Sequence, residues 1–354
     1  MQYGYTEQLA SPLRGPALEE LKAFLARAGL TYAPGIEHTA LVRDVEGTII
    51  ASASLEGSVI KCVAVDEARR GEDLTAAVLT ALTRRATEEG RRQLFLYTKP
   101  ENRTRFLALG FFEVARAGEV LFMENRRGGF DAWIASLPPP PAGGIAGAVV
   151  MNANPMTLGH RYLAEQAANR CDFLYVFVVS EDRSAVPAAE RLAIVREALA
   201  DLPHTVTAGT GAYLISSATF PDYFLKDKAR TGEVWSELDA EVFCRLARRL
   251  GITRRFVGSE PFCPVTAAYN QTMARLFPAQ GVELIELPRL ERAGTPVSAT
   301  AVRALAAAGR WEALQGLVPE AVRRYFAEER HRAQFLARLE PSVGAPLARF
   351  GNTE

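Results

Sequence analysis

The 354-residue chain carries 41 basic and 41 acidic side chains. Its zero net charge argues against a polyanion as the main partner, because nucleic-acid binders usually show a basic excess or a basic stripe. Hydrophobic residues make up 48% and charged residues 23%, an ordinary globular balance, and the length predicts two domains because it exceeds what one core usually serves.

The N-terminal part reads as antiparallel strands with one long helix. β-prone runs between Gly-containing turns predict strands over residues 39–43, 48–54 and 58–64. Apolar residues at helical spacing predict a helix over 74–89. We expect the remaining elements to be strands over 93–97, 111–114 and 120–123 and a short helix over 102–109.

A proline and glycine run, Ser136-Leu-Pro-Pro-Pro-Pro-Ala-Gly-Gly144, marks the predicted domain junction. Consecutive prolines favour an extended, stiff backbone, and the glycines then loosen it. We therefore expect a first domain over residues 1–136, a linker over 137–144, a second domain over 145–330 and a C-terminal helix or tail over 331–354.

Strands and helices alternate in the second part. The pattern predicts strands over 145–151, 173–179, 205–207, 255–257 and 282–286. Helices are predicted over 158–168, 189–200, 242–250, 266–276, 299–307, 311–317 and 320–328. This alternation implies a parallel, doubly wound sheet, whose ligands sit at the carboxyl ends of the strands. The predicted fold class is thus α/β, with an α+β domain followed by a Rossmann-like domain.

The loop Met151-Asn-Ala-Asn-Pro-Met-Thr-Leu-Gly-His160 joins the first strand of this domain to a helix N-terminus. Free N–H groups and a partial positive charge make such an end favourable for phosphate. Thr157 is the expected N-cap, and Gly159 allows close approach to the backbone. The positive helix end disfavours imidazolium at His160, so we expect a neutral, N–H-donating ring that can stabilise charge on a transferring phosphoryl group.

A second helix start lies far downstream, at Val297-Ser-Ala-Thr-Ala-Val-Arg303. Ser298 can cap this helix, whose free N–H groups can hold β- and γ-phosphates. Arg303 lies about one turn further on and can neutralise departing pyrophosphate. Ordinary capping is the alternative, which the first loop makes less favourable.

The remaining histidines and cysteines lack such a context. We expect the histidines at the surface or in loops, and they are His38, His204 and His331. The cysteines are far apart and are expected to be buried small hydrophobes, namely Cys62, Cys171, Cys244 and Cys263. The pairs Arg248-Arg249 and Arg323-Arg324 are expected on solvated helix faces. Without a signal-peptide pattern or a run long enough to span a bilayer, the expectation is a cytoplasmic protein without membrane contact.

The two helix starts together resemble the signatures of the adenylyl-transferring nucleotidyltransferase superfamily, whose Rossmann-like domains form the HUP class. Four further segments resemble citrate lyase ligase in the same order along the chain. They are Val178-Val-Ser-Glu-Asp-Arg183, Ile215-Ser-Ser-Ala-Thr-Phe-Pro-Asp-Tyr-Phe-Leu-Lys-Asp227, Phe256-Val-Gly-Ser-Glu-Pro-Phe-Cys-Pro-Val-Thr266 and Gly316-Leu-Val-Pro-Glu320. The resemblance covers nearly the whole chain.

This resemblance implies a ligase that activates acetate with ATP, releasing pyrophosphate. It then passes the acetyl group to the thiol of a phosphoribosyl-dephospho-CoA arm on the acyl carrier subunit of citrate lyase, releasing AMP. Mg²⁺ bound through the phosphates is expected, and no all-protein metal site.

The implied catalytic residues are His160, Arg303 and Lys226. His160 would contact α- or β-phosphate oxygens, and Lys226 would neutralise acetate or phosphate unless it is a surface lysine. The pyrophosphate end would be held by Ser298, Thr300 and Arg303, and the phosphate loop shaped by Asn152, Asn154, Thr157 and Gly159. Arg191 is a phosphate candidate or a solvated arginine, and Gly258 and Glu260 would face adenine or ribose.

The N-terminal domain resembles GNAT-type N-acetyltransferases at Val65-Asp-Glu-Ala-Arg-Arg-Gly-Glu-Asp-Leu-Thr75 and Asn102-Arg-Thr-Arg-Phe-Leu-Ala-Leu-Gly-Phe-Phe112. Asp73 and Thr75 stand at small positions of the usual pyrophosphate loop, R-G-x-G-x-[GA], which argues against independent acetyl-CoA catalysis. A domain that docks the carrier or its arm, and a purely structural domain, both stay open.

Three other functions are open alternatives. The chain could adenylylate a phosphorylated metabolite and never form AMP, which the ligase-like segments after Ile215 disfavour. It could be a non-catalytic ATP-binding regulator, against which the intact phosphate loop argues. It could acetylate amines, against which Asp73 and Thr75 argue.

Overall fold

The computed structural model describes residues 4–33, 35–182, 184–214, 230–260 and 263–339. The chain divides into two compact units, Met1–Ala132 with Thr219–Glu241 and Trp133–Ala218 with Val242–Glu354. The domain limits at 136, 144 and 330 stay predictions. The segment 215–227, which carries part of the resemblance, lies outside the described residues.

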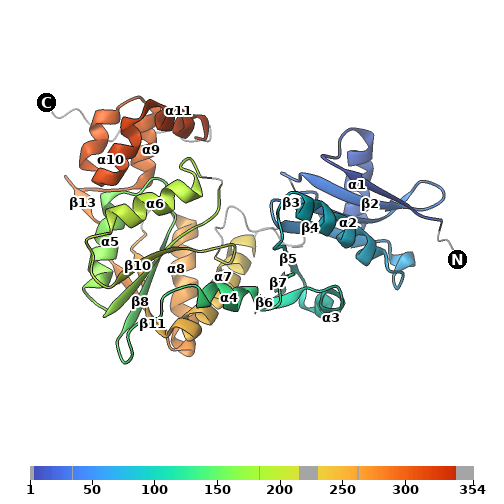
Figure 1. Ribbon diagram of the computed structural model, residues 1–354, viewed down its shortest axis with the longest axis horizontal. Coiled ribbons are helices and arrows are strands. Elements are labelled where there is room, and N and C mark those ends of the chain that lie inside the picture. The colour runs from blue at the N-terminus through green and yellow to red at the C-terminus, as the bar shows by residue number, and fades with distance from the viewer. Residues whose placement is uncertain (1–3, 34, 183, 215–229, 261–262, 340–354) are drawn as a thin grey trace. The chain divides into compact units, whose positions relative to one another are not determined.

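The N-terminal unit is built on a seven-stranded sheet (Figure 1). In sheet order its strands are β1 (Thr6–Ala10), β2 (His38–Arg43), β3 (Ile49–Glu56), β4 (Val59–Val65), β5 (Phe95–Thr98), β7 (Val120–Glu124) and β6 (Phe112–Ala117). The predicted antiparallel arrangement holds except for β4 and β5, which pair parallel. A helix connects these two strands, and parallel neighbours need such a crossover.

Helices α1 (Pro16–Arg27), α2 (Leu74–Glu88), α3 (Arg103–Ala108) and α4 (Gly129–Ala135) follow the strands of this part of the chain. The predicted apolar face of α2 is buried in the hydrophobic core of the unit, together with residues of β2, β3 and β4. The sequence pattern missed β1, α1 and α4. Strand β1 is mostly exposed and polar, so it lacks the alternation that marks a half-buried strand.

The second unit contains the predicted parallel, doubly wound sheet. In sheet order its strands are β10 (Thr205–Gly209), β9 (Phe173–Val178), β8 (Ala146–Met151), β11 (Ile252–Gly258) and β12 (Glu283–Leu287). Every neighbouring pair is parallel. The chain runs outward from β8 to β10 and then returns to the other side of β8 with β11. Ligands of such sheets bind beyond the carboxyl ends of the strands at this reversal.

The helices from residue 158 onward match the predicted ones closely. They are α5 (Leu158–Ala168), α6 (Ala188–Ala198), α7 (Thr231–Leu250), α8 (Pro264–Leu276), α9 (Ala299–Ala307), α10 (Glu320–Ala327) and α11 (Glu329–Ala337). Helix α7 begins well before the predicted residue 242, and the segment predicted as a helix over 311–317 is the 3₁₀ helix η5 (Trp311–Gly316). A short hairpin of β13 (Glu291–Arg292) and β14 (Thr295–Pro296) precedes α9.

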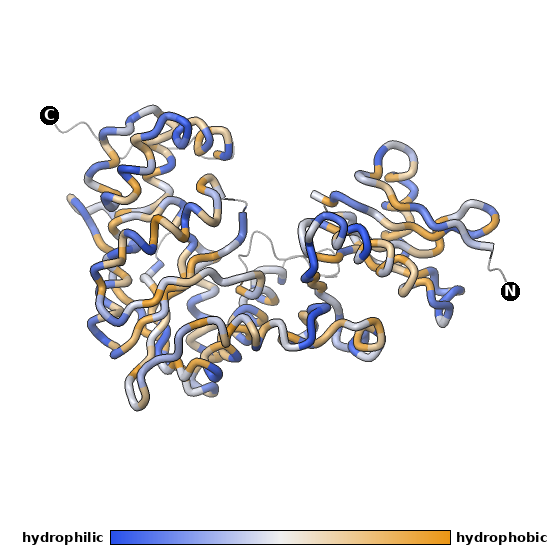
Figure 2. Tube along the Cα trace, in the orientation of Figure 1, coloured by the Kyte–Doolittle hydropathy of each residue, from blue (hydrophilic) through white to orange (hydrophobic). Residues whose placement is uncertain are grey.

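One hydrophobic core joins the sheet to the C-terminal helices. It contains Val149, Val176 and Ile194 together with Val302 and Phe326. Helices α9 to α11 lie side by side in Figure 1, and α10 and α11 alternate hydrophobic and hydrophilic residues in Figure 2. Among the described residues, no helix is long and apolar enough to cross a membrane.

The expectations for the histidines and cysteines hold in part: His204 is exposed in a turn as expected, whereas His331 is half-buried on α11. His38 is buried, because its ring lies between Ser11 Oγ at 2.6 Å and Glu89 at 3.0 Å. Cys62 and Cys244 are buried as expected, whereas Cys171 is half-buried and Cys263 is exposed. Cys263 precedes Pro264 as the N-cap residue of α8. The two arginine pairs are exposed on their helices, as predicted.

Candidate functional site

Thr157 and His160 begin α5 by capping each other. Thr157 is the N-cap as predicted, and its Oγ1 accepts the backbone N–H of His160 at 3.3 Å. In return, the backbone N–H of Thr157 donates to His160 Nδ1 at 3.0 Å. A backbone N–H can only donate, so Nδ1 must be the unprotonated nitrogen. The neutral ring therefore carries its proton on Nε2.

The neutral state of His160 follows from its surroundings. Burial of the ring, assisted by the guanidinium groups of Arg289 and Arg303, lowers the pKa of His160 to about 4. The helix N-terminus was the expected cause of a neutral ring, but burial is the larger one. At neutral pH His160 is an uncharged N–H donor beside two cations.

The second helix start touches the first. Ser298 caps α9, as predicted, and its Oγ accepts the backbone N–H of Ala301 at 3.2 Å. A Cβ atom on Gly159 would lie 2.8 Å from the backbone oxygen of Val297. The missing side chain of Gly159 therefore admits the backbone of the downstream segment, so that the two segments can pack together.

Arg303 fastens α9 to the loop after β8. Its Nη1 donates to the backbone oxygen of Asn154 at 2.8 Å, and its Nη2 donates to Thr300 Oγ1 at 3.1 Å. The side chain is half-buried, and burial lowers the pKa of Arg303. A partly desolvated cation thus stands beside the loop that carries Asn152 and Asn154.

Arg191 is fully buried on α6 and supports the same loop from behind. Its Nη1 donates to both the backbone oxygen and Oδ1 of Asn152, each at 2.6 Å. Its remaining bonds go to the backbone oxygens of Val186, at 3.0 Å, and Glu181. Most of its donors are therefore used within the protein. This geometry is that of a positioning residue, and full burial contradicts the alternative of a solvated arginine.

The loop between Asn152 and Asn154 has an unusual backbone. Ala153 is buried and has a φ of 51°, which is uncommon for residues other than glycine. Asn154 Oδ1 accepts the backbone N–H of Val186 at 3.0 Å, which ties the loop to the segment after β9. The bonds from Arg191 and to Val186 hold this conformation in place.

Gly258 is the last residue of β11, and Glu260 follows it by two residues, on the other side of the strand reversal. Glu260 forms an ion pair with Arg289, whose Nε donates to the backbone oxygen of Ser259 at 2.6 Å. The expected contact of Glu260 with adenine or ribose would compete with this pair. Among the described residues, no atom lies within 4 Å of a Cβ placed on Gly258, so none of them fills the space beside it.

Arg289 was missed in the sequence. It follows the last strand, β12, by two residues and reaches the surroundings of His160. A basic residue just after the carboxyl end of a parallel strand was the available signal.

Lys226 lies outside the described residues. Among the described residues, one group has the ligand atoms for a metal ion: Glu37, His38 and Glu89 in the N-terminal unit. Arg91 forms ion pairs with both of these carboxylates. The guanidinium therefore already neutralises the charge that would attract a cation.

The geometry around α5 and α9 is suited to a phosphate-bearing ligand. Two capped helix starts, a neutral imidazole N–H donor and two guanidinium groups occupy one edge of the sheet, at the reversal of strand order. Such an edge offers positive potential and hydrogen-bond donors, and its carboxylate Glu260 is paired with Arg289.

Two solved structures resemble parts of the chain. Escherichia coli ElaA is 17% identical, covers 34% of this chain and 98% of its own, and has a TM-score of 0.30. The NadR protein in complex with NAD and AMP-PNP is 18% identical, covers 51% of this chain and 46% of its own, and has a TM-score of 0.34.

Sequence relatives are much more similar. The family model described as the citrate lyase ligase C-terminal domain matches residues 146–326. The citrate (pro-3S)-lyase ligase of Klebsiella pneumoniae is 40% identical over 311 residues, which make up 86% of this chain and 91% of the relative. The match includes both helix starts and the strands that position them. The chain belongs to the citrate lyase ligase family.

Proposed function

We propose that the chain activates acetate with ATP and transfers the acetyl group to the thiol of the phosphoribosyl-dephospho-CoA arm on the acyl carrier subunit of citrate lyase. As a member of its family, the chain is a ligase that activates citrate lyase. The observation that carries the finer proposal is the contact between the two helix starts, where Arg303 binds the Asn154 carbonyl beside a neutral His160.

The first step needs a hydrogen-bond donor that stabilises the negative charge developing at the α-phosphate. A carboxylate oxygen of acetate attacks the α-phosphorus, the bond to the bridging oxygen breaks, and pyrophosphate leaves. His160 Nε2–H donates to a phosphate oxygen, since Nδ1 is held by the Thr157 N–H at 3.0 Å. A donor fixed before the reaction stabilises developing charge without reorganisation.

The start of α9 holds the leaving pyrophosphate. Ser298 orients the free N–H groups of the helix, while Thr300 is exposed next to Arg303 and offers its hydroxyl. Arg303 supplies the charge, and Mg²⁺ carried by the phosphates would neutralise more of it. The cationic surroundings and paired carboxylate of this edge fit a metal that arrives with the nucleotide.

The residues of the phosphate loop hold these donors in position. Arg191 fixes the backbone and the amide of Asn152, and Asn154 binds both Arg303 and the segment after β9. Gly258 leaves open space for the nucleoside at the end of β11, and the Glu260–Arg289 pair borders it. Lys226 is retained as a candidate for binding acetate.

In the second step the carrier thiolate attacks the acyl carbon of acetyl-adenylate. The carbon–oxygen bond to the phosphate breaks, and AMP leaves. The enzyme forms no covalent bond in either step, so its contribution is positioning and charge stabilisation.

Labelled pyrophosphate and labelled acetate test the two steps separately. Acetate-dependent exchange between ATP and pyrophosphate should proceed without the carrier. AMP formation should require acetate and the carrier thiol together. Pyrophosphate release without AMP, in the presence of a competent carrier, would instead favour a nucleotidyltransferase that adenylylates a phosphorylated metabolite.

A further inference from the structure

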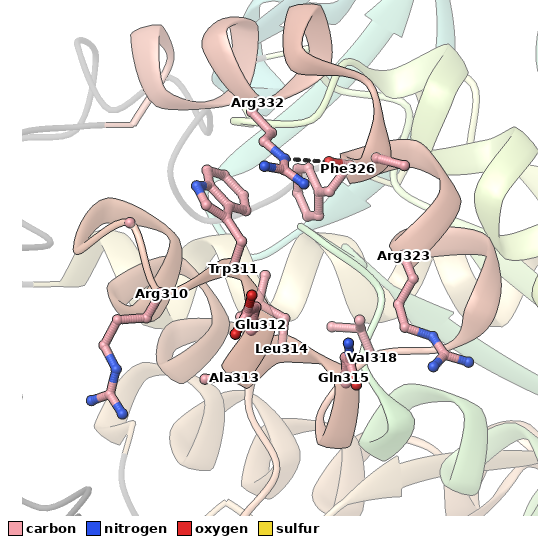
Figure 3. Close-up of a pocket in the computed structure, with 12 residues that line it drawn as sticks. Arg310, Trp311, Glu312, Ala313, Leu314, Gln315, Val318, Arg323, Phe326 and Arg332 are labelled. Carbon is pink, nitrogen blue, oxygen red and sulfur yellow. Dashed lines mark hydrogen bonds between the residues drawn. The ribbon is translucent and has the colours of Figure 1, made fainter.

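A large pocket lies among the C-terminal helices, away from the residues assigned above. Its volume is about 690 Å³, within the range of small-molecule sites. It is lined by the residues just after α9, by η5, and by residues of α10 and α11. Figure 3 shows Trp311 in its wall, with Arg332 above it and Arg310 and Arg323 on opposite sides.

The pocket is cationic. Three arginines line it, Arg310, Arg323 and Arg332, against a single carboxylate from Glu312. Arg310 is exposed and makes no ion pair in the part of the chain that the structure describes, so its charge is available. Arg323 pairs with Glu320 on an exposed helix face, where such pairs contribute little and are easily exchanged.

An aromatic platform stands between these charges. The guanidinium carbon of Arg332 lies 5.1 Å from the centre of the Trp311 ring, and Arg332 Nε donates to the backbone oxygen of Phe326. The Trp311 and Phe326 rings are 5.2 Å apart. These contacts hold the indole and the guanidinium in fixed positions. Fixed aromatic planes stack nucleobases, and arginines grip phosphates.

We propose that this pocket binds the nucleotide end of the carrier's phosphoribosyl-dephospho-CoA arm, with its base at Trp311 and its phosphates at Arg310 and Arg323. The inference rests on the proposed function, because it identifies where that enzyme holds its second substrate. The size, the charge and the aromatic wall together match a phosphorylated base better than a free carboxylic acid.

The pocket is joined to the proposed reaction site. Helix α9 begins directly after its cap Ser298, beside the phosphate loop, and ends two residues before Gly309, which lines the pocket. Its nine residues span about 13 Å. The backbone N–H of Leu158 also donates to the oxygen of Leu317, next to η5, at 2.8 Å. A flexible pantetheine chain anchored at Trp311 can therefore extend its thiol towards His160.

A charge-removal variant tests this placement. In Arg310→Ser/Arg323→Ser the KM for the holo carrier in AMP formation should rise about tenfold, equivalent to about 1.4 kcal/mol. Acetate-dependent ATP–pyrophosphate exchange should keep its rate, because it does not use the arm. The matched control is Arg324→Ser/Arg330→Ser, which removes two exposed arginines from α10 and α11 outside the pocket. This control should leave the KM unchanged.

Binding of free dephospho-CoA gives an independent readout. It should quench Trp311 fluorescence in the wild type, and the quench should be lost in Arg310→Ser/Arg323→Ser and in Trp311→Phe. An unchanged KM in the pocket variant, or an equal rise in the control, would overturn the pocket assignment. So would tighter quenching by ATP than by dephospho-CoA, which would indicate a regulatory nucleotide site.

The two proposals fail differently. If the wild type forms no AMP with the carrier, the proposed function is wrong, and dephospho-CoA quenching still decides whether the pocket takes such a ligand. If the wild type forms AMP but the pocket variant matches it in KM and quenching, only the pocket inference is wrong.

Discussion

Each unit contains a strand that is followed by a loop and a helix, namely β4 and α2 in one unit and β8 and α5 in the other. The side chains at the N-termini of α2 and α5 differ in charge. Between β8 and α5, Thr157 caps the helix, and the uncharged ring of His160 lies near Arg289 and Arg303. Between β4 and α2, the residues at the helix start are Glu72 and Asp73.

The N-terminal loop, which joins β4 to α2, carries two acidic side chains at the start of the helix. Glu72 accepts the Tyr5 hydroxyl and pairs with Arg69 at 3.5 Å. Asp73 is the N-cap residue of α2, but its side chain makes no capping hydrogen bond and is exposed. Two carboxylates at the positive end of a helix repel the phosphates that such an end would otherwise attract. A helix start becomes an anion site only when the neighbouring side chains leave it positive.

The largest test of this difference is His160→Ala. Without its Nε2–H donor, acetate-dependent ATP–pyrophosphate exchange should fall by about two to three orders of magnitude, the scale for removing one transition-state donor. His204→Ala, at an exposed loop position, is the control and should keep the wild-type rate. A near-normal rate for His160→Ala would remove His160 from the mechanism.

Gly159→Ala should have the next largest effect. The new Cβ would lie 2.8 Å from the Val297 backbone oxygen, so that one of the two helix starts must move. We expect a loss of about 1–3 kcal/mol in the free energy of unfolding of this unit, and slower exchange. Gly232→Ala in α7 is the matched control, since no atom of the described residues lies within 4 Å of its Cβ. Equal melting curves for both variants would contradict the close contact.

Arg303→Met should change the titration of His160. The pKa of His160 is about 4, with burial as the first cause and Arg289 and Arg303 next. Removing one cation should raise that pKa, which should still remain below the ordinary 6.5 because burial persists. NMR titration of the histidine rings measures the change, and Arg330→Met, far from these causes in the sequence, should leave it unaltered. A lower or unchanged pKa of His160 in Arg303→Met would show that the charge of Arg303 on α9 does not act on His160 on α5.

The same pKa predicts a sign for stability. The folded protein favours the neutral ring, so the contribution of His160 is complete above pH 6.5 and is lost as the pH falls towards about 4. The rate of acetate-dependent ATP–pyrophosphate exchange should therefore show no titration of His160 between pH 6 and pH 8.

The smallest effect is expected at the acidic helix start. Glu72→Gln/Asp73→Asn removes two negative charges from the N-terminal loop while keeping the side-chain shapes. Acetate-dependent exchange should stay within about twofold, because neither carboxylate belongs to the residues proposed for the first step, and the altered contacts of Glu72 to Tyr5 and Arg69 should cost about 1 kcal/mol of folding stability. A large fall would show that the N-terminal loop takes part in the first step.

The sequence located the local features of the site well. Thr157 and Ser298 are caps whose signal lies within four residues, so the starts of α5 and α9 were predicted to the residue. The parallel sheet followed from the alternation of elements. The contact between the two starts could only be inferred from resemblance, because Arg303 and Asn154 are 149 residues apart.

Other features depend on distant partners and could not be read locally. Arg191 looks like any helix arginine until three carbonyl-bearing segments are assembled around it. His38 is buried because Ser11 and Glu89, far apart in the chain, meet at its ring. Whether an ionisable group faces solvent, a ligand or another side chain is set by tertiary contacts, which residue type alone does not encode.

The mutual cap of Thr157 and His160 limits which acceptors the first step can use. With one ring nitrogen fixed to the main chain and the other already protonated, the imidazole has no lone pair left to take a proton from an incoming nucleophile. An alcohol or amine would have to lose its proton elsewhere, whereas a carboxylic acid is already ionised at neutral pH. The way the helix begins thus favours nucleophiles that are already anionic, carboxylates and phosphates alike, over alcohols and amines.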